Sequence, residues 1–312
     1  MEIGIYVENR GPEVTPEGLA RYAERAEALG YAFLCLSEHI VAPVRPPEAD
    51  EYRLKNKTRG WEDVLTYFDP VVTLAWLGAR TRRLRLGTSV LIVPYRNPVV
   101  TAKALATLDT LLGGRLFVGV GTGWWADEFA GLGIGDHFAD RGARMDEYLQ
   151  IFRKLWSQEV ATHEGRYFPF REIACAPKPV QQPGPPIWVG GGAKRILRRT
   201  AELGDVWHPV ALRRPGQLDL EQVGAARAEL DALARAAGRD PAAIGISLKC
   251  PMIVTDAERR TLVGTPEQIA EDVRAYAARG VTHLTLDLAR LPGDYFENMV
   301  TIGERVLPLV AK

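Results

Sequence analysis

The chain has 312 residues, and its 39 lysines and arginines balance its 39 aspartates and glutamates, so the formal net charge is zero. A balanced charge argues against nucleic acid or an anionic membrane surface as the main partner, because both attract a basic excess. A hydrophobic content of 46% is typical of a globular protein. No apolar run is long enough for a membrane span and the N-terminus lacks a signal-peptide pattern, so we expect a cytoplasmic protein.

Short apolar runs alternate with amphipathic helical segments along the whole chain. The first strand is expected over residues 2–7, and the helix after it is opened by Thr15 and Pro16 and closed by Gly30. The further apolar runs that we expect to be strands are 32–36, 84–93, 116–120, 187–189, 205–208, 244–249 and 282–288. Each is followed by a helical segment, and these begin near residues 69, 97, 141, 194, 221, 265 and 295.

Eight strands that are each followed by a helix imply a parallel sheet with right-handed crossovers. Eight such units in about 300 residues fit a closed (β/α)8 TIM barrel. A doubly wound sheet is the alternative, but it usually carries a dinucleotide fingerprint in its first turn, and residues 7–11 lack one. We therefore predict a single α/β domain, a TIM barrel over residues 1–312 with insertions at about 43–63 and 158–186.

The fifth expected strand ends in three glycines, Gly190 to Gly192, which are followed by Ala193 and Lys194 at the start of a helix. Glycine lets the backbone approach a ligand closely, and a helix N-terminus offers free N–H groups to an anion. This pattern favours a phosphate site. A tight turn between strand and helix is the alternative.

A second glycine-rich stretch follows the fourth strand, where Gly119, Gly121 and Gly123 have the spacing GxGxG. That spacing differs from the dinucleotide fingerprint GxGxxG. The glycines either let a flat ring approach the backbone or are needed to close the barrel, and the residues leave both possibilities open. Trp124 and Trp125 come next and are placed to wall a flat cofactor or an apolar substrate.

Active sites of TIM barrels lie at the C-terminal ends of the strands, which directs attention to two histidines. His39 follows Glu38 at the end of the second strand, and His208 ends the sixth. Histidine at such a position exchanges protons near neutral pH, although His39 in a loop could instead cap a helix. The three cysteines stand far apart and no HxH occurs, so we expect no metal site.

Several stretches of the chain, in order, resemble the bacterial luciferase-like superfamily of flavin and deazaflavin enzymes. The resemblance covers nearly the whole chain, and the stretches that carry it are Ala26 to Tyr31, Ser37 to His39, Arg85 to Val90, Arg96 to Pro98, Gly114 to Trp124, Arg141 to Tyr148, and Pro186 to Asp205. Two of them, Gly-Trp-Trp-x-x-Glu-Phe at 123–129 and Arg-Gly-Ala-Arg-x-Asp-Glu-Tyr at 141–148, are most similar to the coenzyme F420-dependent oxidoreductase branch.

The resemblance implies a (β/α)8 barrel with insertions and a position for the cofactor. In that family the isoalloxazine or deazaflavin ring leans on a bulge in the third strand, at a non-prolyl cis peptide that maps to Ser89 and Val90. The family's remaining cofactor contacts map to Thr122 and Gly123 beside the ring and to Gly191, Gly192, Ala193 and Lys194 at the phosphate. His39 matches the histidine that follows an acidic residue in deazaflavin sugar-phosphate dehydrogenases.

Three departures from those dehydrogenases change the expectation for the substrate. They have an aspartate where this chain has Glu38, a glutamate acid where it has Trp124, and a tryptophan where it has Pro43. The resemblance therefore implies a proton relay that is not intact and a pocket more apolar than one for a sugar phosphate. We expect the pocket to be lined by Glu38, Trp124, Trp125 and His208, and to be covered by the 43–63 insertion.

The leading hypothesis is an oxidoreductase that moves hydride between reduced coenzyme F420 and a small organic substrate, with His39 as proton donor or acceptor. An FMN-dependent monooxygenase that uses O2 is the alternative, because it shares the barrel and the phosphate site. A flavin-binding protein without turnover is a second alternative. A separate flavin or F420 reductase is a conceivable partner, and apolar outer helices make a homodimer the expected assembly.

Overall fold

The computed structural model describes residues 1–312 except 12–13, 43–65, 212–217, 289–293 and 311–312. The predicted 43–63 insertion, its role as a cover and Pro43 therefore lie outside the described residues. In the part of the chain that is described, no helix is both long and apolar enough to cross a membrane.

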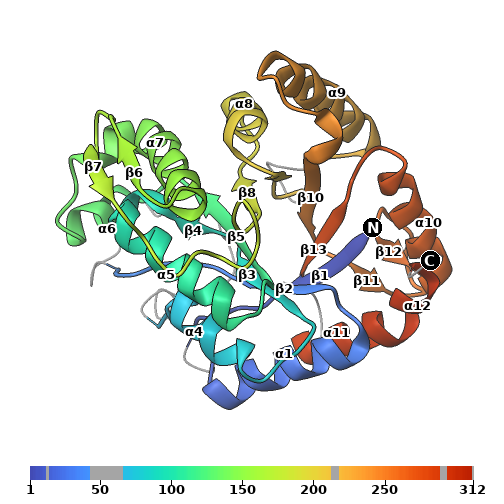
Figure 1. Cartoon of the computed structure of the whole chain (residues 1–312). Coiled ribbons are helices and arrows are strands. Elements are labelled where there is room, and N and C mark those ends of the chain that lie inside the picture. Colours follow the sequence, from blue (N-terminus) through green and yellow to red (C-terminus); the bar gives the residue numbers. More distant parts are fainter. Residues whose placement is uncertain (12–13, 43–65, 212–217, 289–293, 311–312) are drawn as a thin grey trace.

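A closed ring of parallel strands forms the centre of the molecule (Figure 1). Its strands are β1 Glu2–Tyr6, β2 Phe33–Leu36, β3 Arg85–Thr88, β4 Leu91–Ile92, β5 Leu116–Gly121, β8 Ile187–Gly190, β9 Val206–His208, β10 Gly245–Cys250 and β13 His283–Asp287. They pair in the order β3, β2, β1, β13, β10, β9, β8, β5, β4, and pairing between β3 and β5 closes the ring. Because β3 and β4 are two halves of one strand, the described residues form an eight-stranded barrel, which confirms the predicted TIM barrel.

Helices surround the barrel on the outside (Figure 1). They are α1 Pro16–Leu29, α4 Pro70–Gly78, α5 Pro98–Leu111, α6 Ala126–Gly131, α7 His137–Ser157, α8 Lys194–Leu203, α9 Leu220–Ala236, α10 Pro266–Ala277, α11 Tyr295–Arg305 and α12 Leu307–Val310, with 3-10 turns η1 Val93–Tyr95 and η2 Pro241–Ala243. Most begin where the sequence indicates a cap. Asp69 accepts hydrogen bonds from two backbone N–H groups of α4, and Thr265 forms a capping box with Gln268.

The predicted insertion at 158–186 contains a small antiparallel hairpin, β6 Ala161–His163 and β7 Phe170–Ile173, which the sequence does not predict. A second small pair, β11 Ile253–Val254 and β12 Val263–Gly264, lies outside the barrel. Glu147 of α7 accepts hydrogen bonds from the backbone N–H groups of Arg166, Tyr167 and Phe168 at 2.7–3.1 Å. These bonds fasten the loop of the β6–β7 hairpin to α7.

The barrel lumen is filled by aromatic side chains, so it is a solid core. Phe33, Phe117 and Trp188 pack together there, and the rings of Phe117 and Trp188 stack at 4.2 Å between centroids. A Cβ on Gly4 would overlap the Phe33 ring, so the strand approaches that ring more closely than alanine allows. The lumen is therefore closed by this layer, and the residues to examine for a site lie at the C-terminal ends of the strands.

The third strand is interrupted by a bulge, which divides the predicted run 84–93 into β3 and β4. The peptide bond between Ser89 and Val90 in this bulge is cis, as the resemblance implies. The glycines of β5 make room for it, because a Cβ on Gly119 would overlap the Thr88 carbonyl and one on Gly121 would lie 2.5 Å from Val90 Cγ2. This packing supports barrel closure as the reason for these two glycines.

Candidate active site

His39 lies just beyond the end of β2, and its imidazole is hydrogen-bonded to a buried carboxylate. Its Nδ1 is 2.7 Å from Oε2 of Glu128, a residue of α6. The side chain of Glu128 has no exposed surface, whereas 13% of the His39 side chain is exposed. Because an ionised carboxylate only accepts hydrogen bonds, this contact places the imidazole proton on Nδ1 and leaves Nε2 available for exchange.

Two further donors converge on the same carboxylate. The backbone N–H of Ile40 donates to Oε1 of Glu128 at 2.6 Å, and the hydroxyl of Tyr95 donates to Oε2 at 2.8 Å. With the bond from His39, these contacts hold the carboxylate of Glu128 at a fixed position in a buried setting. The orientation of the His39 ring is fixed by the same contacts.

Glu128 is a carboxylate beside His39 that the sequence analysis does not single out. The predicted loss of the relay's acid concerns Trp124, which stands at the position of that acid in the dehydrogenases, and Glu128 stands four residues further along the chain. Glu128 lies in α6, which begins two residues after Trp124, and its side chain reaches His39. The signal was a glutamate in the first turn of a helix that follows a barrel strand.

Aromatic rings surround His39 on several sides. The rings of Tyr67, Trp124 and Trp125 meet the imidazole edge to face, with centroids 5.2, 6.1 and 5.9 Å away. Trp124 and Trp125 lie parallel to each other at 5.7 Å between centroids. Trp125 is 5% exposed and Trp124 is 37% exposed, so Trp124 presents the larger apolar surface to solvent. The sequence does not single out Tyr67, which precedes the cap of α4 by two residues.

His208 is buried inside the barrel mouth and contacts the bulge of the third strand. Its Nε2 is 2.9 Å from Ser89 Oγ, and its Nδ1 is 3.1 Å from Ser247 Oγ, which in turn lies 3.0 Å from Thr285 Oγ1. Burial, reinforced by the charge of Lys249, lowers the pKa of His208 to about 3. The imidazole is therefore neutral near pH 7, and it holds the Ser89 hydroxyl in place.

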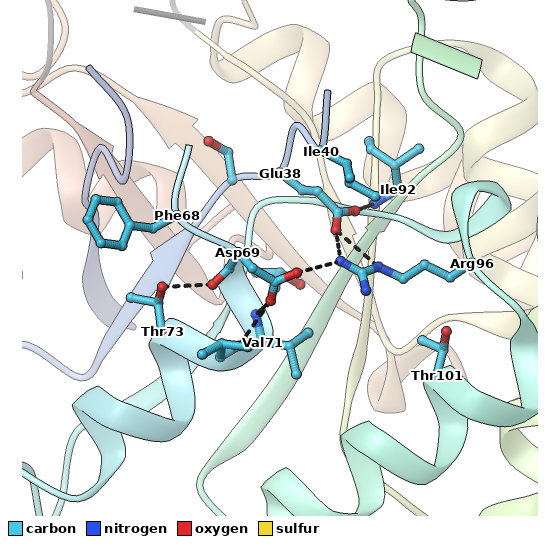
Figure 2. Close-up of polar contacts among 12 residues, drawn as sticks. Glu38, Ile40, Phe68, Asp69, Val71, Thr73, Ile92, Arg96 and Thr101 are labelled. Carbon is cyan, nitrogen blue, oxygen red and sulfur yellow. Dashed lines mark hydrogen bonds and ion pairs between the residues drawn. The ribbon is translucent and has the colours of Figure 1, made fainter. Parts of the chain in front are cut away.

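Glu38 was expected in the substrate pocket, but the structure gives it another environment (Figure 2). Its side chain has no exposed surface. Its Oε2 accepts the backbone N–H of Ile92 at 2.6 Å, and its Oε1 accepts Nε of Arg96 at 3.0 Å. These bonds turn the Glu38 carboxylate toward the third strand, whereas His39 bonds to Glu128 of α6. Burial raises the pKa of Glu38, while Arg96 opposes that shift.

The start of α8 carries the predicted phosphate residues. Gly191 has a φ of +125°, and its backbone N–H donates to the carbonyl of His208 at 3.3 Å. A Cβ on Gly192 would meet no atom within 4 Å, so the approach to this turn is open. Ala193 is the N-cap and offers no side-chain hydrogen bond to the first turn of α8, which begins with Lys194. This helix start keeps backbone donors for an anion.

Thr122 and Gly123, the predicted neighbours of the ring, lie at the end of β5. Gly123 has a φ of +74°, and its carbonyl accepts Nε of Arg141 at 3.1 Å. Burial and the nearby charge of Arg195 both lower the pKa of Arg141. Arg141 of α7 and Arg195 of α8 therefore add positive charge near the predicted phosphate turn.

A second polar group lies at the ends of β1, β10 and β13. The ammonium of Lys249 is 3.3 Å from the centroid of the Tyr6 ring and 4.0 Å from Oδ2 of Asp287. Burial raises the pKa of the Cys35 thiol to about 12, so that thiol is protonated and unreactive. Among the described residues, no group of three or more His, Cys, Asp or Glu side chains is arranged to hold a metal ion.

Comparison with known proteins gives one family and a mixture of activities. Residues 1–260 match the family model described as luciferase-like monooxygenase. An uncharacterized protein of Mycobacterium tuberculosis is 31% identical over 290 residues, which cover 88% of this chain and 95% of that protein. The F420-dependent glucose-6-phosphate dehydrogenase of Segniliparus rotundus is 36% identical over 175 residues, but the match spans only 51% of this chain and 52% of the dehydrogenase.

Solved structures of the same shape use different cofactors. The monooxygenase RslO1 of Streptomyces bottropensis superposes with a TM-score of 0.77 and 25% identity over 99% of both chains. An F420-dependent secondary alcohol dehydrogenase holding an F420–acetone adduct has a TM-score of 0.76 at 18% identity, over 99% of this chain and 98% of that one. A type II Baeyer–Villiger monooxygenase of Pseudomonas putida in complex with FMN has a TM-score of 0.73 at 18% identity with the same coverage.

Proposed function

The chain belongs to the luciferase-like monooxygenase family, and on this premise we propose that it is an oxidoreductase that transfers hydride between reduced coenzyme F420 and a small organic substrate. The hydrogen bond between His39 and Glu128 is the observation that carries the proposal. It provides an oriented imidazole at the barrel mouth, where a hydride acceptor needs a proton. The match to the Segniliparus rotundus dehydrogenase supports F420 as the cofactor.

The residues of this chain suit such a cofactor at both of its ends. At the phosphate end, the N-cap Ala193 makes no side-chain bond and Gly192 has open space. The proposed phosphate contacts are the turn at Gly191 and the backbone N–H groups of Gly192, Ala193 and Lys194. At the ring end, the proposed supports are Ser89 and Val90 of the bulge, with Thr122 and Gly123 beside them.

The proposed roles of the side chains follow from their contacts. His39 holds one proton on Nδ1 against Glu128 and exchanges another at Nε2 with an oxygen or nitrogen of the substrate. Trp124 and Trp125 supply apolar surface that excludes water from the substrate. His208, neutral and bonded to Ser89, keeps the bulge in place. When bound, reduced F420 supplies the hydride.

An FMN-dependent monooxygenase is the second candidate, and the observation that favours it is the likeness to RslO1 over 99% of both chains. The same barrel, bulge and helix start would then serve reduced FMN, and O2 would be the co-substrate. We also propose that the protein is a homodimer in the cytoplasm, and that a separate F420 or flavin reductase renews its reduced cofactor.

Titration of the purified protein with F420 and with FMN, each oxidised and reduced, tests the proposal. Trp124 and Trp125 lie beside the site, so quenching of tryptophan fluorescence reports binding. Saturable binding of F420 with weaker binding of FMN is the expected result. A preference for reduced FMN would favour the monooxygenase, and binding of neither cofactor would refute both candidates.

A further inference from the structure

The four residues from Ser37 to Ile40, which include His39, are all bonded to other elements. Asn9 is fully buried, and its amide bonds both backbone groups of Ser37, donating to the carbonyl at 2.9 Å and accepting the N–H at 3.1 Å. Glu128 accepts from His39 and from the backbone of Ile40. Between these anchors, Glu38 makes the connection to the third strand.

Glu38 bonds to the third strand where the regular strand ladder stops. β2 pairs with β3 up to Leu36 and Thr88, and Ser89 N donates to the Leu36 carbonyl at 2.6 Å. Beyond the bulge, β4 pairs with β5 on one side. On the other side, the backbone N–H of Ile92 donates to the carboxylate of Glu38. This side chain therefore takes the place of a strand partner for β4.

Arg96 completes the connection and extends it to the next helix (Figure 2). Its guanidinium contacts Oε1 of Glu38 through both Nε and a terminal nitrogen, and it also bonds to Oδ2 of Asp69 at 3.0 Å. Asp69 is the N-cap of α4, where its Oδ1 accepts the N–H groups of Val71 and Val72 at 2.9 and 3.0 Å. The Glu38 carboxylate and the Arg96 guanidinium together thus tie the segment that carries His39 to β4 and to α4.

We propose that Glu38 is a positioning residue that sets the place of His39 relative to the Ser89–Val90 bulge. It is bonded to the backbone two residues after Val90 and is the direct neighbour of His39 in sequence. Its functional meaning rests on the proposed function, in which the bulge supports the cofactor ring and His39 serves the substrate. Because the Glu38 side chain has no exposed surface, the proposed role works through its bonds to Ile92 and Arg96.

Glu38→Gln is the variant that tests this role. A glutamine has one acceptor oxygen, so it cannot satisfy both Ile92 N and Arg96, and its amide N–H2 meets one of these two donors. We expect the strand end and the bulge to separate slightly and the His39–Glu128 bond to change. Arg96→Lys, which keeps the charge but loses the planar two-nitrogen contact, is expected to act in the same direction.

Glu27→Gln is a matched control at the other end of the same strand. The Oε2 of Glu27 accepts the backbone N–H groups of Arg82, Arg83 and Leu84 at 2.7–2.8 Å, directly before β3. Like Glu38→Gln, the Glu27→Gln variant removes a carboxylate that accepts backbone N–H groups, but it does so at the end of the barrel remote from His39. A purely structural role of Glu38 would make the two variants alike.

The first readout needs no cofactor. The chain has five histidines, and 15N NMR of histidine-labelled protein, with His39→Asn for assignment, reports the protonation pattern of the His39 ring. We expect Glu38→Gln and Arg96→Lys to shift the 15N signals of the His39 ring, and Glu27→Gln to leave them unchanged. The second readout is the Kd of the cofactor, expected to rise about tenfold in Glu38→Gln and to stay within about twofold in Glu27→Gln.

The proposal is overturned if the His39 spectrum is unchanged in both Glu38→Gln and Arg96→Lys. It is also overturned if Glu27→Gln changes that spectrum as much as they do. If Glu38→Gln does not fold, Arg96→Lys decides by the same spectra. If the wild type binds neither F420 nor FMN, the proposed function fails, and the spectra still decide whether Glu38 positions His39. A shifted His39 spectrum together with weaker cofactor binding supports both.

Discussion

Replacing Glu128 by glutamine is the most informative single change at the candidate site. The side chain keeps its size, but one of the two carboxylate oxygens becomes an N–H2 group that donates. In the wild type, Oε1 of Glu128 accepts from Ile40 N, and Oε2 accepts from His39 and Tyr95. The amide has two orientations, and neither one satisfies all three donors.

If the amide oxygen faces His39, the N–H2 group meets the backbone N–H of Ile40 and leaves a buried donor without an acceptor. That loss costs about 1–3 kcal/mol of unfolding free energy. If the oxygen faces Ile40, the N–H2 group donates to Nδ1 of His39, and the imidazole proton moves to Nε2. Nε2 then holds the single ring proton and Nδ1 is blocked by the amide N–H2, so the ring cannot take up and release a second proton at Nε2. We therefore expect kcat/KM to fall about 10²-fold or more.

The assay is oxidation of reduced F420 with a panel of ketones, enones and imines, together with urea unfolding of each variant. Tyr95→Phe is the matched control, because it removes one donor from Glu128 and leaves the His39 bond in place. We expect it to cost about fivefold at most. Wild-type turnover in Glu128→Gln would refute the role given to the His39–Glu128 bond. So would a loss of turnover in Tyr95→Phe as large as that in Glu128→Gln.

Three further predictions follow from other parts of the structure. The pKa of His208 is about 3 in the fold and near 6.5 when unfolded, so the unfolded chain binds the extra proton and stability falls as pH falls. Between pH 7 and 5 this lowers the free energy of unfolding by about 2 kcal/mol, and urea unfolding of His208→Gln is expected to lack this part of the pH dependence. An equal pH dependence in wild type and variant would contradict the burial of a neutral imidazole. Ala193→Asp is expected to stabilise α8 by about 0.5–1 kcal/mol in urea unfolding, yet to weaken cofactor binding in the fluorescence titration, because its carboxylate occupies the N–H groups and repels the phosphate; unchanged binding would contradict the phosphate site. Gly119→Ala, whose Cβ overlaps the Thr88 carbonyl, is expected to lower stability by about 3 kcal/mol or more, whereas Gly192→Ala in open space costs about 1 kcal/mol at most; similar unfolding curves for the two variants would speak against the packing of β5 on the bulge.

The barrel is predictable from this sequence because its signals are local. Each strand is a short apolar run, and several helices open with a side-chain cap followed by proline, as at Asp69-Pro70 and Asn97-Pro98. The β6–β7 hairpin escapes prediction since its second strand, Phe170–Ile173, has no buried residue and hence no apolar periodicity. It is held instead by Glu147 of α7.

The site is less predictable because its bonds join residues far apart in sequence. His39 and Glu128 are 89 residues apart, and neither spacing nor composition indicates that they meet. Glu38 was placed in the pocket because it precedes His39, although its carboxylate bonds instead to Ile92 N and Arg96. Its partner Arg96 is 58 residues away, so the network in Figure 2 becomes visible only in the fold.

Anaerobic turnover of reduced F420 shows whether the protein transfers hydride without O2. The protein is mixed with reduced F420 and the substrate panel without O2, and the same mixtures are repeated with reduced FMN in air. We expect at least one organic acceptor to oxidise reduced F420 without O2, and His39→Asn and Glu128→Gln to slow this reaction strongly. Turnover that requires both reduced FMN and O2 would contradict it.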